Sequence, residues 1–244
     1  MGGSSFVGVT TYLTSQGDAV TVTLSTTATA GSPVGQYPIT ATLSGAKASN
    51  YFIDPGTSSA GTMYVVSLGA DPSSTTGAQS VVFWDSKGNK SLITTADLSS
   101  LDALNLVNQS GAAFDPNAVA QLQAWLSISP NATTSYQLAV QLAVMDLNVL
   151  TGYVRTTDLV YAGSLLAYQT TYGITGLTSG GFISVQNLMN AANSALALDS
   201  RATAGDPNQA YQAALTSVLQ TANGNTDFVK QELLWNLVNL YPSL

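Results

Sequence analysis

The chain has 244 residues, of which 45% are hydrophobic and only 8% are charged. Its formal net charge is −7 and its six basic residues are scattered, so no basic patch can neutralise nucleic-acid phosphates or an anionic membrane surface. It contains no cysteine and no histidine, which excludes disulfides, Cys- or His-ligated zinc and nucleophiles activated by an imidazole. This composition favours a globular protein with a neutral polar surface that works outside the cell.

No segment has the pattern of a leader peptide or a membrane span. Residues 1–5 lack a basic start and an apolar run, so we expect the chain to be part of a longer parent protein. No uninterrupted apolar run reaches the roughly 18 residues that cross a bilayer. The expected partner is therefore an extracellular polymer or a component of the cell surface, rather than nucleic acid or a membrane interior.

Alternating apolar and polar residues predict strands in the first quarter of the chain. Valine and leucine alternate with threonine over residues 19–24, a similar alternation covers residues 37–43, and a further strand is expected at 62–66. Short turn sequences separate these segments. Few strands and frequent turns predict a small all-β, immunoglobulin-like sandwich over residues 1–67.

The composition then changes, and a second domain is expected. Residues 68–80 are rich in Gly, Ser, Thr and Pro, so they are predicted to be a linker. Residues 81–244 are predicted to form an all-α, multi-helix domain that opens with a hairpin over residues 81–94. Further helices are expected to begin near residues 96, 116, 185 and 207, and a last one to span residues 227–240.

The predicted helical domain is organised around a central apolar helix at about residues 134–151. Its apolar side chains point in almost every direction, as in a helix surrounded by others. Gln141 and Asn148 belong to a narrow polar stripe, while Asp146 projects into the opposite, apolar side. Because burial perturbs the pKa of an acid, Asp146 is the candidate catalytic residue. The alternative is a structural Asp146 bonded to a backbone amide, a tyrosine hydroxyl or Arg155.

A short set of residues in the β region carries a family resemblance. Gly35-x-Tyr37-x-Ile39, Gly45 and Asn50-Tyr51-x-Ile53 resemble the glycine-rich, mostly-β repeat called the MBG module, over about residues 18–67. The resemblance implies an immunoglobulin-type repeat of a large bacterial surface protein. Any small sandwich with a Tyr-x-Ile strand is the alternative.

The helical half contains several short motifs of its own. They are Phe83-Trp84, Ala103-Leu-Asn-Leu-Val107, Phe114-Asp-Pro116, Leu147-Asn-Val149 and Gly181-Phe182. Over residues 81–229 this pattern resembles an all-helical domain at the C-terminal ends of large secreted bacterial proteins with immunoglobulin-type repeats. The resemblance implies a bacterial extracellular or cell-surface location, and it supplies no catalytic residue.

Aromatic side chains near loops are the candidate ligand-binding residues. Tyr153 and Tyr172 are expected in or beside loops, and Trp84 lies in the predicted hairpin. Aromatic faces can stack on sugar rings, and packing in a core is the alternative for the tryptophans.

One loop faintly resembles a calcium site. Asp85, Asn89 and Asp97 place oxygen atoms before a helix, but Lys87 occupies the position where a second acid is expected. A plain turn followed by a helix cap is the favoured interpretation. We therefore expect no cofactor, and calcium is the alternative.

Three functions are compatible with these patterns. The leading hypothesis is a non-catalytic extracellular module that spaces, anchors or adheres, because no nucleophile–base or metal motif is recognisable. The second is carbohydrate binding through loop aromatics. The third is a hydrolase or lyase acting on an extracellular polymer, in which Asp146 would need a second acid from another helix.

Overall fold

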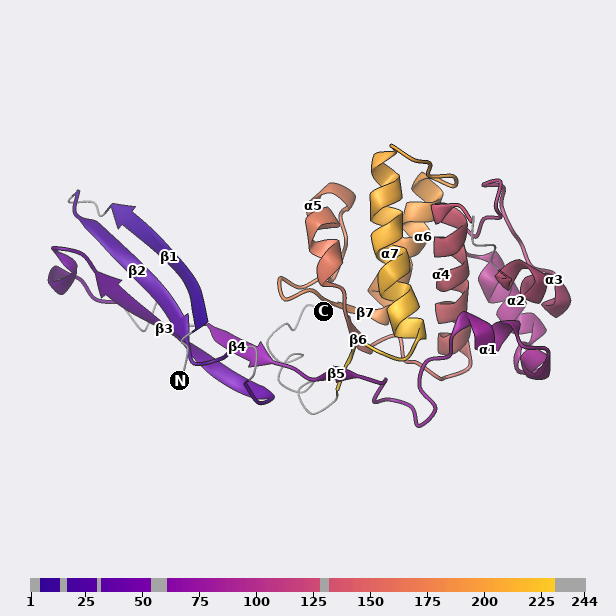
Figure 1. Ribbon diagram of the computed structural model, residues 1–244, viewed down its shortest axis with the longest axis horizontal. Coiled ribbons are helices and arrows are strands. Elements are labelled where there is room, and N and C mark those ends of the chain that lie inside the picture. The colour runs from indigo at the N-terminus through magenta and orange to yellow at the C-terminus, as the bar shows by residue number, and fades with distance from the viewer. Residues whose placement is uncertain (1–4, 14–16, 30–31, 54–60, 128–131, 231–244) are drawn as a thin grey trace. The chain divides into compact units, whose positions relative to one another are not determined.

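The computed structural model describes residues 5–13, 17–29, 32–53, 61–127 and 132–230 (Figure 1). The chain divides into two compact units, Met1–Ser67 and Leu68–Leu244. Strands form the first unit and helices dominate the second. At this level the prediction of a β unit followed by a helical unit is confirmed.

The described part of the first unit contains one antiparallel sheet with strand order β1-β2-β3-β4 and a short 3₁₀ helix, Ala48–Asn50. Its strands are β1 (Ser5–Leu13), β2 (Ala19–Thr26), β3 (Gly35–Ser44) and β4 (Thr62–Val65). Side chains of β3 alternate between exposed and half-buried, which fits the period of two in its sequence. No second sheet covers this one among the residues described, so a clear sandwich is not formed.

Residues of the Tyr-x-Ile motif hold the ends of these strands. The Tyr37 hydroxyl donates to the Pro33 carbonyl oxygen at 2.8 Å, and the Tyr51 hydroxyl donates to Asp18 at 3.0 Å. Gly45 has φ +123°, and a Cβ there would lie 2.9 Å from the Ala19 carbonyl oxygen. The turn after β3 therefore requires glycine at this position.

The described second unit contains seven α-helices (Figure 1). They are α1 (Val81–Asp85), α2 (Thr95–Asp102), α3 (Val119–Leu126), α4 (Thr134–Leu150), α5 (Gln169–Tyr172), α6 (Val185–Leu198) and α7 (Pro207–Asn223). Two 3₁₀ helices, Lys87–Leu92 and Gly163–Tyr168, lie between them. Side-chain caps begin four of the α-helices, at Thr94, Thr133, Ser184 and Asp206.

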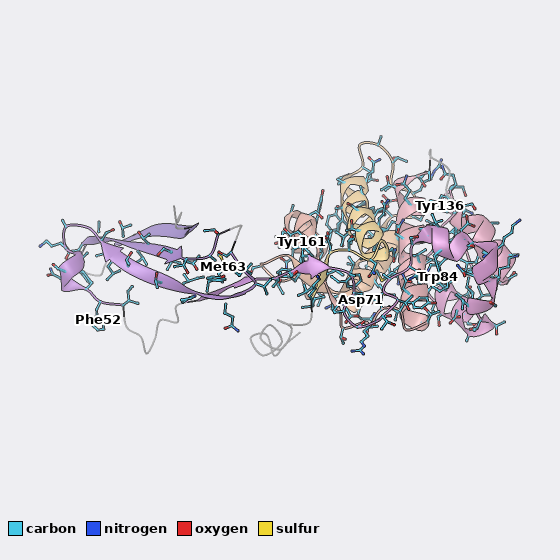
Figure 2. The ribbon with its side chains drawn as sticks, turned by 60° about the horizontal axis from the view of Figure 1, so that its bottom comes forward. Phe52, Met63, Asp71, Trp84, Tyr136 and Tyr161 are labelled. Atoms are coloured by element: carbon cyan, nitrogen blue, oxygen red, sulfur yellow. The ribbon has the colours of Figure 1, made fainter. Side chains whose placement is uncertain are left out.

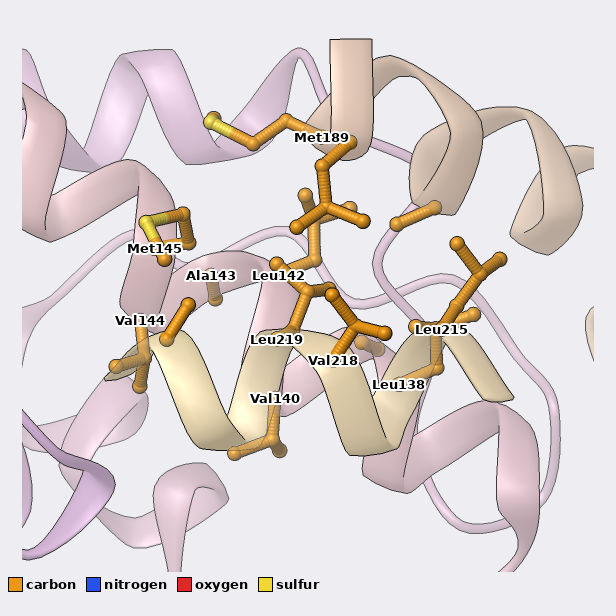
Figure 3. Packing of buried hydrophobic residues seen from close by; sticks show 14 of the residues in the cluster. Leu138, Val140, Leu142, Ala143, Val144, Met145, Met189, Leu215, Val218 and Leu219 are labelled. Atoms are coloured by element: carbon orange, nitrogen blue, oxygen red, sulfur yellow. The ribbon is translucent and has the colours of Figure 1, made fainter. Parts of the chain in front are cut away.

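Helix α4 is the centre of this unit, as predicted. Twelve of its 17 residues are buried, and it packs against both α6 and α7. Figure 3 shows Leu138 and Leu142 of α4 meeting Leu215 and Leu219 of α7 in the core, with Met189 of α6 beside them. Burial of each such leucine contributes roughly 2 kcal/mol, so this contact is a main source of the unit's stability.

The second unit is not all-α, because a small sheet completes it. Its strands are β5 (Leu68–Gly69), β6 (Leu159–Tyr161), β7 (Phe182–Ser184) and β8 (Phe228–Val229), in the order β5-β8-β6-β7. The predicted helix over residues 227–240 is thus wrong at its start, where Phe228 pairs with Val160. Residues 231–244 of that prediction lie outside the described part.

Two further expectations differ from the structure. The hairpin over residues 81–94 is instead α1 and a 3₁₀ helix, since a helical turn encloses Trp84 while Val82 stays 80% exposed. Residues 68–80, expected to be a linker, fold onto the second unit. The Asn225 side-chain oxygen accepts hydrogen bonds from the backbone of Asp71 at 2.9 Å and of Ala78 at 3.2 Å.

Candidate functional site

Two of the hollows among the described residues of the second unit could admit a ligand. The larger has a volume of about 750 Å³ and lies between α1, the end of α3, α4 and α7. Its polar walls include Gln141, Gln220 and Asn223, and its apolar wall includes Val82 and Leu126.

A hydrogen-bonded amide network forms the buried side of this larger hollow. The Asn148 oxygen accepts from the Gln79 backbone N–H at 2.9 Å and from the Trp84 indole N–H at 3.2 Å. The Asn148 NH₂ group donates to the Gln79 carbonyl at 2.9 Å and to the Asn223 oxygen at 3.1 Å. The Asn223 NH₂ group then donates to both oxygens of Gln141. Asn148 therefore makes every hydrogen bond that its amide allows, and it joins α1, α4 and α7.

The smaller hollow has a volume of about 190 Å³ and is bordered by tyrosines. Tyr172, at the end of α5, stacks on Tyr211 of α7 with ring centres 4.0 Å apart and planes at 17°. Asn187 and Asn190 of α6 also line this hollow and provide amide groups. Tyr172 was predicted as a ligand-binding residue, whereas Tyr211 and the two asparagines were not.

Hydrogen bonds fix the orientation of the Tyr172 ring. Its hydroxyl lies 3.2 Å from both the Pro207 carbonyl oxygen and the Asn208 side-chain oxygen. Burial, together with the neighbouring Tyr172, raises the pKa of Tyr211 to about 12, so Tyr211 is a neutral ring under ordinary conditions. Tyr211 is only 3% exposed, so the ring that can offer stacking to a neutral ligand, beside the two amides, is that of Tyr172.

The other two predicted aromatic residues lie together near α1. Trp84 is completely buried, and its ring centre is 6.0 Å from that of the half-buried Tyr153. Phe83 also meets the Tyr153 ring edge-on at 6.0 Å. The structure therefore assigns Trp84 to the core rather than to a binding surface, and Tyr153 covers it.

Asp146 is half-buried on the side of α4 that faces α2. Its Oδ2 atom is buried and has no hydrogen-bond partner. Burial, with the charge of Asp97 as the lesser cause, raises the pKa of Asp146 to about 6. Asp97 is therefore the candidate for the second acid that catalysis by Asp146 would need. Asp146 itself lines neither of the two hollows.

The three predicted calcium ligands have separate partners. Asp85 accepts from the Ser127 hydroxyl at 3.0 Å, and the Asn89 amide donates to the Phe83 carbonyl at 2.9 Å. Asp97 accepts from the Thr94 backbone at 2.7 Å in the capping box of α2. Within the described ranges, no group of three or more acidic side chains has the arrangement of a metal site.

Comparison with known proteins identifies the first unit alone. Residues 6–64 match the family model described as MBG domain (YGX type). The match begins twelve residues before the predicted start at residue 18 and includes β1. It does not extend into the second unit, so the resemblance of residues 81–229 stays a prediction.

No curated protein and no solved structure matches the chain. In the part of the chain that the structure describes, no helix has the length and apolar character that a membrane crossing requires.

Proposed function

We propose that the chain is a non-catalytic segment of a large bacterial surface or secreted protein, in which it spaces, anchors or adheres. The observation that carries this proposal is the match of residues 6–64 to the MBG family model, since such modules are typical repeats of bacterial surface proteins. The low content of charged residues, 8%, also suits a protein that works outside the cell.

The second unit supports the proposal by its construction. Its buried polar groups, such as Asn148 and Gln212, are bonded between helices and hold them together. Such groups specify one rigid arrangement of helices, which suits a module that transmits force or presents a surface.

Adhesion can be tested with the purified full chain coupled to beads. We expect saturable retention on isolated bacterial envelopes or on polysaccharide films, competed by the free chain, with no soluble product released from the film. Turnover of a polysaccharide or an ester above background would overturn the proposal. Loss of that turnover in Asp146→Asn would then support the third hypothesis, an enzyme that uses Asp146.

Carbohydrate binding is the second candidate function, and the smaller hollow favours it. Tyr172, held against the buried Tyr211, lies beside Asn187 and Asn190. An aromatic ring can stack on a sugar C–H face and amides can bond to its hydroxyls. The net charge of −7 disfavours anionic polymers, so a neutral glycan is the expected ligand.

Binding of the full chain to an array of neutral glycans tests this candidate. We expect Tyr172→Ala to abolish the signal and Tyr172→Phe to retain most of it, because the hydroxyl bonds to the protein while the ring borders the hollow. Tyr161→Ala is the matched control, since Tyr161 is 43% exposed and packs on Phe182, away from this hollow. Silence of the array with an intact Tyr172, or equal loss in both alanine variants, would refute carbohydrate binding at this site.

A further inference from the structure

The larger hollow of the second unit has no part in either function proposed above. Its volume of about 750 Å³ falls within the roughly 300–1,000 Å³ of ligand sites in proteins. None of the described residues that line it is aromatic. Without an aromatic face it is poorly suited to stacking on a sugar ring, so its ligand should differ from that of the smaller hollow.

Helix α1 presents apolar side chains to this hollow. Val82 is 80% exposed, and Val81 beside it is half-buried. Both line the hollow, whereas Trp84 of the same helix lies completely buried inside the helical unit (Figure 2). Because an exposed apolar side chain gains free energy when it is removed from water, this wall favours a ligand with an apolar group.

Gln141 of α4 offers the hollow a hydrogen-bond donor. Gln141 is only 7% exposed, and its Oε1 atom accepts from the Asn223 NH₂ group at 2.9 Å, which fixes the orientation of the Gln141 amide. The Gln141 NH₂ group has no hydrogen-bond partner among the described residues, and it is not fully enclosed. Since Gln141 lines the hollow, this group can donate to a carbonyl oxygen of a ligand there.

Asp85 gives the hollow a negative charge. It is half-buried, and its Oδ2 atom accepts from the Ser127 hydroxyl at 3.0 Å, while its Oδ1 atom has no hydrogen-bond partner in the described part of the chain. No lysine or arginine is among the described residues that line the hollow, and the whole chain has a net charge of −7. A cationic group is therefore attracted to this site, and an anionic ligand is repelled.

We propose that the larger hollow binds a peptide segment of a partner protein in which an apolar side chain stands next to a lysine or arginine. The apolar side chain packs on Val81 and Val82, the basic group pairs with Asp85, and a peptide carbonyl accepts from Gln141. A peptide combines these groups within a few residues, since every residue carries a carbonyl acceptor. The site goes beyond spacing or adhesion, and it is separate from the smaller hollow, so peptide binding and glycan binding can fail independently.

Binding of short labelled peptides to the full chain, followed by fluorescence anisotropy, tests this site. The probe has blocked ends and a leucine followed by a lysine; two comparison peptides replace the lysine by glutamate or the leucine by glycine. We expect saturable binding of the probe that weakens as salt is added. Loss of the leucine should weaken binding about tenfold or more, and the change to glutamate about fivefold or more.

Two variants with matched controls locate the bound peptide. Val82→Ser should weaken binding of the probe roughly fivefold to tenfold, because it removes the exposed apolar contact. Leu198→Ser is its control, since Leu198 is 63% exposed on α6 and does not line this hollow. Asp85→Asn should weaken binding about twofold to fivefold and reduce its dependence on salt. The exposed Asp115 supplies the control for the lost charge, and Asp115→Asn should bind the probe as the wild type does.

Other results would overturn the proposal. No binding of the probe by the folded wild type, equal binding of the lysine and glutamate peptides, or equal losses in Val82→Ser and Leu198→Ser would each refute a peptide site in this hollow. Binding that appears only in Trp235→Ala would make the C-terminal segment of the chain itself the occupant. Sedimentation that shows dimers of the wild type but not of Val82→Ser would make a second copy of the chain the occupant.

Discussion

Replacing Asp146 by asparagine should stabilise the chain at neutral pH. The pKa of Asp146 is raised from 3.8 to about 6, mainly by burial. The folded state therefore keeps a proton that the unfolded chain releases between these two values. The resulting stabilisation is complete below pH 3.8 and is lost as the pH rises through about 6.

The size of the effect follows from this shift. A difference of about two pKa units corresponds to roughly 3 kcal/mol, as an upper estimate for a group that is partly exposed. Asp146→Asn has no charge to bury, so we expect it to be more stable than the wild type by up to about 3 kcal/mol at pH 7.5, and nearly equal at pH 4.

Urea unfolding followed by tryptophan fluorescence measures this difference, since Trp84 and Trp125 are buried in the second unit. The wild type and Asp146→Asn are compared at several pH values between 4 and 8, with Asp115→Asn as the control for an exposed carboxylate. A loss of stability that is the same at every pH would refute the reasoning, because it would mean that Asp146 is well bonded in its charged form. A stabilised variant would instead mark an acid that is retained at a cost to stability, as functional residues often are.

Two other substitutions test the packing of the second unit by the same unfolding assay. Asn148→Ala should destabilise this unit by about 3 kcal/mol or more, because the indole N–H of Trp84 and two backbone groups of Gln79 lose their buried partner. A change below about 1 kcal/mol would mean that water replaces the side-chain amide. Gly181→Ala should lower the free energy of unfolding by at least about 1 kcal/mol, since Gly181 has φ +80° and a new Cβ would lie 2.8 Å from Gly163 Cα. Gly173→Ala is the control, because Gly173 has a similar φ but a Cβ there meets no neighbour, so the loss should be smaller.

The sequence predicted those helices and strands that are long enough for the spacing of their apolar residues to show a helical or a strand period. Helix α4 is long and apolar on most sides, so its existence, its bounds and its central position could all be predicted. Residues 81–84 gave the wrong answer because four apolar residues fit a strand or a helical turn equally well. The strands β5 and β8, with two residues each, are too short to show any alternation.

The candidate sites were harder to predict because they depend on contacts between distant segments. Tyr172 could be selected as an aromatic residue near a loop, but its stacking partner Tyr211 belongs to another helix. The same holds for Asp71, which lay in a stretch that resembled a linker by composition. Its burial depends on Asn225 and its electrostatic environment on Asp158, and neither is near it in the sequence.

Asp146 and Asp71 show why an enclosed acid does not by itself indicate catalysis. Asp146 has a buried Oδ2 atom without a hydrogen-bond partner, whereas Asp71 has a side-chain hydrogen bond with Asp158. Burial is the largest cause of the raised pKa in each. Asp71 has a second enclosed carboxyl group beside it, that of Asp158, and Ser73 donates a hydrogen bond to each of them. Asp146 has only the charge of Asp97, whose carboxylate is already used in the cap of α2. The raised pKa of each acid should therefore appear as a loss of stability when the pH rises, and neither shift requires a catalytic role.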